Sequence, residues 1–210
     1  MSLEELREQN IRLVTEKALE CFIKNGINNT RVSEIAAESG LTQRSVFRYF
    51  PSKDDIVIAA AFCYWERTKA YIARELRCHT DDAQTGIEQI NIILNSYANM
   101  LFVDPEGIRF SLDAEVALYS VGKNAHVINR PPERYEAYKG PLSQAVRRGL
   151  ADGTVDPGAN IKQLYYNAYD SILGMMQRLT VDVPSVSELD AHERLESMCA
   201  MFTREFAAKK

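Results

Sequence analysis

The spacing of the apolar residues limits the fold of this chain more than any other feature of its sequence. Over long stretches they recur at i, i+3, i+4 and i+7, the pattern of an amphipathic helix, and no long run alternates apolar and polar residues. The glycines and prolines fall mainly between these stretches. The sequence therefore predicts an all-α fold of about nine helices, over roughly residues 6–25, 31–39, 43–49, 53–78, 85–102, 105–119, 132–151, 157–180 and 187–207.

Length and composition narrow the class of protein. With 210 residues, 46% of them hydrophobic, the chain can bury a core. Its longest unbroken apolar run, Ile56–Trp65, is about half of what a bilayer helix needs. The start of the sequence, Met1–Glu5, is acidic, whereas a secretory signal begins with basic and then apolar residues. We expect a cytoplasmic protein with no membrane partner.

Residue types that often catalyse reactions or bind metals do not form a working pattern. No two cysteines make a C-x-x-C pair. They are predicted to be free thiols: Cys21, Cys63, Cys78 and Cys199. His192-Glu193 begins like the H-E-x-x-H zinc motif, but Glu196 replaces its second histidine. Neither G-x-S-x-G nor the phosphate-binding G-x-x-x-x-G-K-[ST] occurs. We predict no catalytic residue, no metal, no cofactor and no enzymatic activity.

Three short helices are predicted within the first 50 residues, and only Gly40-Leu41-Thr42 separates the second from the third. This is the arrangement of a helix-turn-helix. Gly40 allows the positive φ of a sharp turn. Thr30 and Thr42 are predicted to cap the second and third helices at their N-termini.

The third of these helices is predicted to have a buried side and an outward side. Val46 and Phe50 lie four residues apart and face the core, whereas Arg44 and Arg48 lie about 200° from Val46 around the helix. Arginine commonly bonds guanine, and glutamine can bond adenine. Lys53, at the start of the next helix, is placed to reach a phosphate. The outward residues are Gln43, Arg44, Ser45, Phe47 and Arg48.

The charge distribution agrees with a nucleic-acid contact at this helix. Residues 24–53 hold 5 basic and 2 acidic residues, a net charge of +3. Residues 54–210 hold 17 basic and 22 acidic residues, a net charge of −5. Because phosphate affinity depends on the basic groups at the contact, the overall charge of −4 does not exclude DNA.

One segment of the chain resembles the DNA-binding domain of TetR-family repressors. It reads Gly26…Thr30-Arg31-Val32-Ser33-Glu34-Ile35-Ala36-Ala37-Glu38-Ser39-Gly40-Leu41-Thr42-Gln43-Arg44-Ser45-Val46-Phe47-Arg48-Tyr49-Phe50-Pro51-Ser52-Lys53. The resemblance is close over about 45 residues; beyond them it extends only to length, helix count and all-α character. It implies a DNA-binding domain over residues 1–53, or to about residue 70, with the helix-turn-helix at about 31–50. Residues 54–210 would form a helical ligand-binding and dimerisation domain.

The resemblance also implies DNA contacts at individual positions. Phe47 stands where the family usually has a tyrosine, so the phosphate contact of that hydroxyl is in doubt and Arg48 is its expected substitute. Thr30, Arg31 and Thr42 correspond to phosphate contacts, Gln43, Arg44 and Arg48 to contacts with bases and nearby phosphates, and Tyr49 and Lys53 to backbone contacts. The expected DNA-binding set is Thr30, Arg31, Thr42, Gln43, Arg44, Ser45, Phe47, Arg48, Tyr49 and Lys53.

The last two predicted helices each have a continuous apolar stripe. The family resemblance implies that these helices form a four-helix interface between two subunits, and the alternative is ordinary core within one chain. A dimer also fits DNA recognition, because a two-fold pair can contact two half-sites about one turn, roughly 34–36 Å, apart. The candidate interface residues are Ile161, Leu164, Ala168, Ile172, Met175, Leu195, Met198 and Phe202.

Aromatic residues are frequent in the body of the chain. In this family an effector cavity lies among such helices, and apolar walls with a few hydroxyls suit a hydrophobic ligand. The alternative is that most of these rings belong to the core. The candidate pocket residues are Phe62, Trp65, Tyr97, Phe102, Phe110, Tyr119, Tyr138 and Tyr169.

The predicted function is therefore a homodimeric repressor that binds a palindromic double-stranded DNA operator. A small hydrophobic or aromatic molecule would release it, through a shift of the helix that follows Lys53. An activator, or a regulator controlled by a partner protein, is the alternative.

Overall fold

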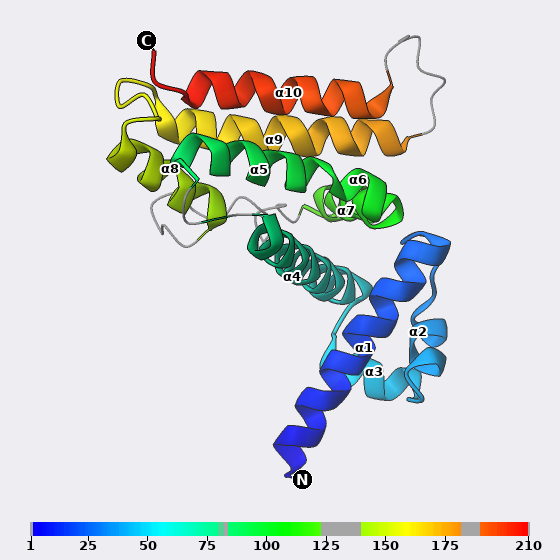
Figure 1. Ribbon diagram of the computed structural model, residues 1–210. Coiled ribbons are helices and arrows are strands. Elements are labelled where there is room, and N and C mark those ends of the chain that lie inside the picture. The colour runs from blue at the N-terminus through cyan, green and yellow to red at the C-terminus, as the bar shows by residue number, and fades with distance from the viewer. Residues whose placement is uncertain (1, 80, 82–83, 123–139, 182–189, 210) are drawn as a thin grey trace. The chain divides into compact units, whose positions relative to one another are not determined.

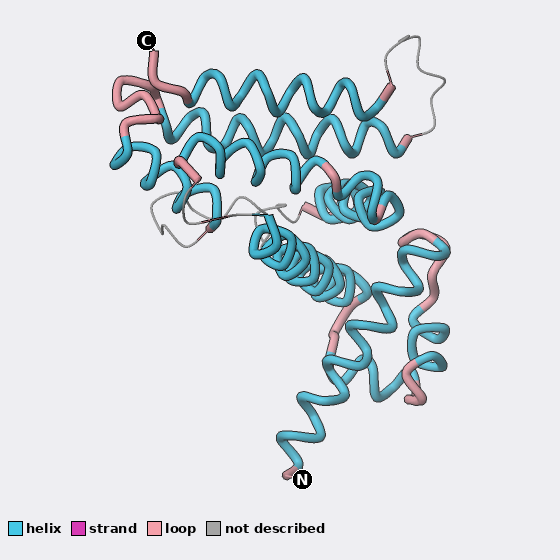
Figure 2. The backbone as a smooth tube through the Cα atoms, in the orientation of Figure 1, coloured by secondary structure: helices cyan, strands magenta, loops and turns pink. Residues whose placement is uncertain are grey.

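The structure, a computed structural model, describes residues 2–79, 81, 84–122, 140–181 and 190–209 (Figures 1 and 2). Its regular structure in these ranges is helical, apart from one isolated antiparallel bridge between Val155 and Ala207. The helices are α1 (Leu3–Asn25), α2 (Val32–Glu38), α3 (Gln43–Tyr49), α4 (Lys53–His79), α5 (Gly86–Ala98), α6 (Met100–Val103), α7 (Pro105–Ser120), α8 (Pro141–Asp152), α9 (Ile161–Thr180) and α10 (Ala191–Phe206). The all-α prediction is confirmed. No helix in the described part of the chain is long and apolar enough to span a bilayer.

Nine of these ten helices correspond to predicted ones, with differences at several ends. The predicted helix 85–102 divides at Asn99 into α5 and the four-residue α6, which gives the tenth helix. Helix α8 begins at Pro141 rather than residue 132, and residues 123–139 lie outside the described ranges. The start of the predicted helix 187–207 also lies outside them, and α10 begins after Asp190, whose side chain accepts a hydrogen bond from the Glu193 N–H.

Local hydrogen bonds explain two other departures. Helix α1 starts three residues earlier than predicted because Ser2 and Glu5 form a capping box, in which each side chain accepts the backbone N–H of the other. Helix α9 starts at Ile161 rather than 157. The Asp156 side chain accepts the Gly158 N–H in a turn, and Asn160 then serves as the N-cap.

The chain divides into two compact units. Unit 1 consists of residues 1–67 and 106–130, and unit 2 of residues 68–105 and 131–210, so α4 contributes residues to both. The predicted functional boundary at residues 53 and 54 remains a prediction.

In unit 1 an aromatic cluster joins α1, α4 and α7. The rings of Phe22 and Phe110 are stacked with centroids 6.2 Å apart, and Tyr64 meets Phe110 edge to face at 5.9 Å. All three side chains are buried. These ring contacts fix α1 against α4 and α7. Helix α1 in turn packs along α2.

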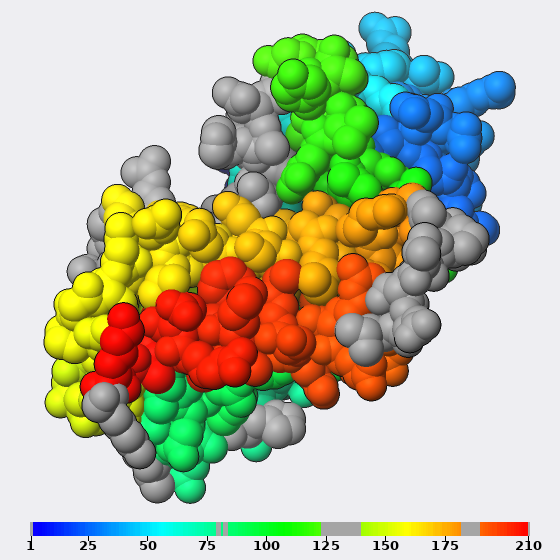
Figure 3. Space-filling model, turned by 90° about the horizontal axis from the view of Figure 1, so that it is seen from above, coloured from blue at the N-terminus to red at the C-terminus, as the bar shows by residue number. Residues whose placement is uncertain are grey.

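In unit 2 the helices α5, α8, α9 and α10 pack together, and Figures 1 and 3 show α9 and α10 side by side. Helices α5 and α8 approach so closely that a Cβ on Gly86 would lie 2.0 Å from the backbone nitrogen of Gly149. At this crossing the Asp152 carboxylate accepts the Gly86 N–H at 2.7 Å. Only glycine fits at position 86, so this position fixes how the two helices cross.

Candidate nucleic-acid interface

The turn between α2 and α3 has the geometry that its sequence predicts. Gly40 has a φ of +65°, and the N–H of Leu41 donates to the Ala36 carbonyl at 2.9 Å. On the inner side of α3, Val46 is fully buried and Phe50 is buried just after the helix. The helix-turn-helix and its buried side are therefore confirmed.

The opposite side of α3 presents its side chains to solvent. Gln43, Arg44 and Arg48 are exposed, and Ser45 is half-buried. Phe47 is 40% exposed. The outward face therefore combines two cations and an amide with one aromatic ring.

The two threonines predicted as caps differ in their surroundings. Thr42 caps α3 as predicted, since its hydroxyl accepts the Ser45 N–H at 3.2 Å. Thr30 does not cap α2, because Arg31 occupies the N-cap position. Thr30 is 1% exposed, and its hydroxyl donates to the Gly26 carbonyl at 2.8 Å and to the Cys21 carbonyl at 3.2 Å. The predicted phosphate contact of Thr30 does not fit this placement, because the hydroxyl is used inside the fold.

The cations just before and after the helix-turn-helix differ in exposure. Arg31 is exposed at the start of α2, where its backbone N–H donates to Glu34. Lys53 is half-buried at the start of α4, and partial burial lowers the pKa of its ammonium. Ser52 caps α4, through a hydrogen bond from the Asp55 N–H.

Tyr49 connects α3 to α1. Its hydroxyl oxygen accepts a hydrogen bond from Arg48 Nη2 at 3.0 Å and another from Asn10 Nδ2 at 3.2 Å. The Arg48 guanidinium also lies 5.1 Å from the centre of the Tyr49 ring. The hydrogen bond from Arg48 is the main cause that lowers the pKa of Tyr49. Asn10 is not among the residues that the sequence predicts, and it stands out only as a polar residue at the end of an exposed stretch of α1.

The candidate dimer residues fall into two groups. Ala168, Ile172 and Leu195 are fully buried within their own chain, so these three are core and cannot meet a partner. The others are half-buried: Ile161, Leu164, Met175, Met198 and Phe202. Met201, 46% exposed and not predicted, lies one turn from Met198 on α10. The two helices are visible on one face of unit 2 in Figure 3.

The candidate pocket residues do not form one set. In unit 1, Trp65 and Phe110 are buried while Phe62 and Tyr119 are exposed. In unit 2, Tyr97 and Tyr169 are buried with ring centroids 5.0 Å apart, and Phe102 is exposed. Tyr138 lies outside the described residues. Most of the buried rings thus pack against other rings, as the core alternative predicts.

Trp65 differs from the other buried rings. It is fully buried, and its indole Nε1 has no hydrogen-bond partner among the residues that the structure describes. A buried N–H without an acceptor is unfavourable, so this donor is suited to a bound acceptor atom.

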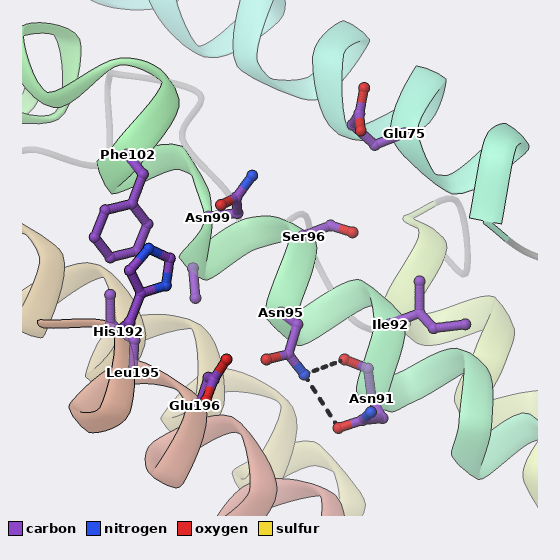
Figure 4. Close-up of a pocket in the computed structure, with 11 residues that line it drawn as sticks. Glu75, Asn91, Ile92, Asn95, Ser96, Asn99, Phe102, His192, Leu195 and Glu196 are labelled. Atoms are coloured by element: carbon purple, nitrogen blue, oxygen red, sulfur yellow. Dashed lines mark hydrogen bonds between the residues drawn. The ribbon is translucent and has the colours of Figure 1, made fainter.

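Unit 2 has an open pocket of about 550 Å³ between the end of α4, α5, α6 and α10 (Figure 4). Its lining is more polar than predicted. Asn95 donates to the carbonyl and side-chain oxygens of Asn91, and the rings of Phe102 and His192 are stacked 3.6 Å apart. The lining residues are Glu75, Asn91, Ile92, Asn95, Ser96, Ala98, Asn99, Phe102, His192, Leu195 and Glu196. Phe102 alone among the predicted pocket residues contributes to it.

Comparison with known proteins agrees with this interface. Residues 14–60 match the family model described as bacterial regulatory proteins, tetR family. The chain is 30% identical over 90 residues to the uncharacterized HTH-type transcriptional regulator YuxN of Bacillus subtilis (strain 168), a match that spans 43% of this chain and only 30% of YuxN. It is 21% identical over 149 residues to the fatty acid metabolism regulator protein of the same strain, across 71% of this chain and 72% of that protein.

A solved structure extends the likeness to the whole fold. A TetR transcriptional regulator from Chloroflexus aurantiacus J-10-FL superposes with a TM-score of 0.66 and 18% identity, over 98% of this chain and 100% of that one. The fold and the interface together define an all-α helix-turn-helix DNA-binding protein. Residues 14–60 are thus a DNA-binding domain of the tetR family of bacterial regulatory proteins, the domain of a transcriptional regulator.

Proposed function

We propose that the chain is a homodimeric repressor that binds a palindromic operator through the outward face of α3 and is released by a small molecule. The observation that carries this proposal is the outward face itself, where Arg44 and Arg48 are exposed on a helix whose other side is buried. The proposed contact residues are Arg31, Thr42, Gln43, Arg44, Ser45, Phe47, Arg48, Tyr49 and Lys53. Such a protein acts in the cytoplasm, where the operator is.

The half-exposed apolar residues of α9 and α10 support the homodimer. Met198, Met201 and Phe202 follow the i, i+3, i+4 spacing along one side of α10, and Leu164 and Met175 are half-buried on α9. Apolar side chains left in solvent on two adjacent helices favour association with a second copy.

The proposed effector is hydrophobic, with at least one hydrogen-bond acceptor. The Nε1 of Trp65 on α4 has no hydrogen-bond partner among the described residues, which supports the acceptor, and the same helix begins with Lys53 beside the DNA-binding helix. A relative named as a fatty acid metabolism regulator favours an acyl compound as the first class to test. The effector must bind the state with low DNA affinity more tightly, because otherwise the equilibrium does not shift.

A titration with two readouts tests this function. Trp65 is the only tryptophan, so its fluorescence reports binding without a second source. We expect one member of a panel of fatty acids and planar aromatic carbonyl compounds to change Trp65 fluorescence and to lower affinity for the upstream DNA of the protein's own gene. If every compound that binds leaves DNA affinity unchanged, release by these classes is wrong. Transcription of that DNA in vitro separates a repressor from an activator.

A further inference from the structure

The Tyr49 hydroxyl joins two helices that are distant in sequence. Asn10, 39 positions earlier on α1, donates to it from one side and Arg48 from the other, at 3.2 and 3.0 Å. Tyr49 itself is half-buried, so its ring is held while its hydroxyl stays near the surface.

The hydrogen-bonding capacity of this hydroxyl determines what it can do next. A phenol oxygen accepts about two hydrogen bonds and donates one. Arg48 and Asn10 occupy the two acceptor positions, so the hydroxyl is left with one hydrogen bond to donate. A phosphate oxygen is the strongest acceptor that DNA offers beside a cation.

Arg7 adds a second cation at this place. It lies three residues before Asn10 on the same helix, a spacing that puts two side chains on one face. Its side chain is exposed and makes no ion pair with any described residue. Its positive charge is one of the causes that lower the pKa of Tyr49, which agrees with this placement.

We propose that α1 is part of the DNA-contact surface: Asn10 is a positioning residue that holds the Tyr49 hydroxyl as a phosphate donor, and Arg7 binds phosphate beside it. The proposal rests on the DNA-binding function of the domain. It also offers a replacement for the hydroxyl that Phe47 lacks, because Tyr49 supplies the only tyrosine hydroxyl on α3.

The test uses the full chain and a mixed-sequence 30-base-pair duplex, because phosphate contacts do not depend on an operator. We expect Tyr49→Phe to weaken binding about 10-fold and Asn10→Ala about 5-fold, as for lost charge-assisted hydrogen bonds. Since Asn10 acts through Tyr49, adding Asn10→Ala to Tyr49→Phe should change affinity less than about 2-fold. Arg7→Ala should reduce the slope of log K against log salt by about 0.9.

Matched substitutions on α1 serve as controls. Gln9→Ala removes a neighbouring exposed amide, and Arg12→Ala removes an exposed arginine from another side of the helix. Both should bind as the wild type does, and circular dichroism confirms that each variant is folded. Independent, additive losses from Asn10→Ala and Tyr49→Phe would overturn the positioning role. Binding by Asn10→Ala equal to that of Gln9→Ala would do the same, whereas failure of the wild type to bind any duplex would overturn DNA binding itself.

Discussion

The turn that joins α2 to α3 in unit 1 and the packed helices of unit 2 differ in the range of the contacts that form them. The turn between α2 and α3 depends on bonds such as that from the Leu41 N–H to Ala36, five residues away. In unit 2, the Gly86 N–H reaches Asp152, 66 residues along the chain. Local contacts follow from local sequence, so the comparison separates what sequence patterns can place from what only the folded chain determines.

The largest expected effect comes from disturbing the long-range packing of α5 against α8 in unit 2. Gly86→Ala would place a Cβ 2.0 Å from the backbone nitrogen of Gly149 and 2.3 Å from its Cα, so it would displace the crossing where the backbones of α5 and α8 nearly touch. We expect a loss of about 3 kcal/mol in stability or more, as for severe overpacking. The melting temperature followed by circular dichroism measures it. Gly174→Ala is the control, since its Cβ meets nothing within 4 Å and should be neutral or slightly stabilising.

This contrast explains how much of the fold the sequence predicts. Helix type and most boundaries follow from periodicity and capping residues, and Thr42 is one cap that was predicted correctly. The failure at Thr30 has a competing cause nearby in the chain, because carbonyls four and nine residues earlier accept its hydroxyl. A threonine before a helix fits the capping pattern equally well in either case, so the pattern alone does not separate them.

The next largest effect is expected at α3, which is positioned by short-range contacts. Arg44→Ala should weaken operator binding by about 1–3 kcal/mol and relax the preference at one base pair. Lys53→Ala should weaken binding to all sequences alike, because it contacts phosphate. Fluorescence anisotropy on the operator and on single-base variants separates the two. An equal loss from Arg44→Ala on every sequence would show that Arg44 does not bond a base.

A smaller effect comes from Phe47. Phe47→Tyr restores a hydroxyl to a side chain that is already 40% exposed on the outward face. We expect DNA affinity to rise by about 1 kcal/mol if that hydroxyl reaches a phosphate. The same anisotropy assay at fixed salt measures it. Unchanged affinity would place position 47 away from the DNA backbone.

The smallest effect is a pH dependence in unit 2. Hydrogen bonds from Thr154 and from the Gly86 N–H lower the pKa of Asp152 from its ordinary value of 3.8. Because the folded pKa is the lower one, the contribution to stability is present above that ordinary value and is lost as pH falls through the folded pKa. Asp152→Ala should therefore lower the melting temperature by a few degrees at neutral pH. The difference from wild type should shrink below about pH 4, and a constant difference would contradict this role.

Local and long-range contacts also decide which candidate site residues could be predicted from the sequence. The outward residues of α3 could be predicted because one short helix with one buried side leaves few choices. The aromatic residues of the body could not be sorted in the same way. Tyr97 packs against Tyr169 across helices more than 70 positions apart, and Ile172 is fully buried although its spacing equally suits a dimer interface.

The central claim is that two copies of the outward face of α3 contact DNA together. Selection of tight-binding duplexes from a random pool by the full chain tests it most directly. We predict an enriched palindrome whose half-sites lie about one helical turn apart. Enrichment of an asymmetric sequence, or of none, would contradict the account.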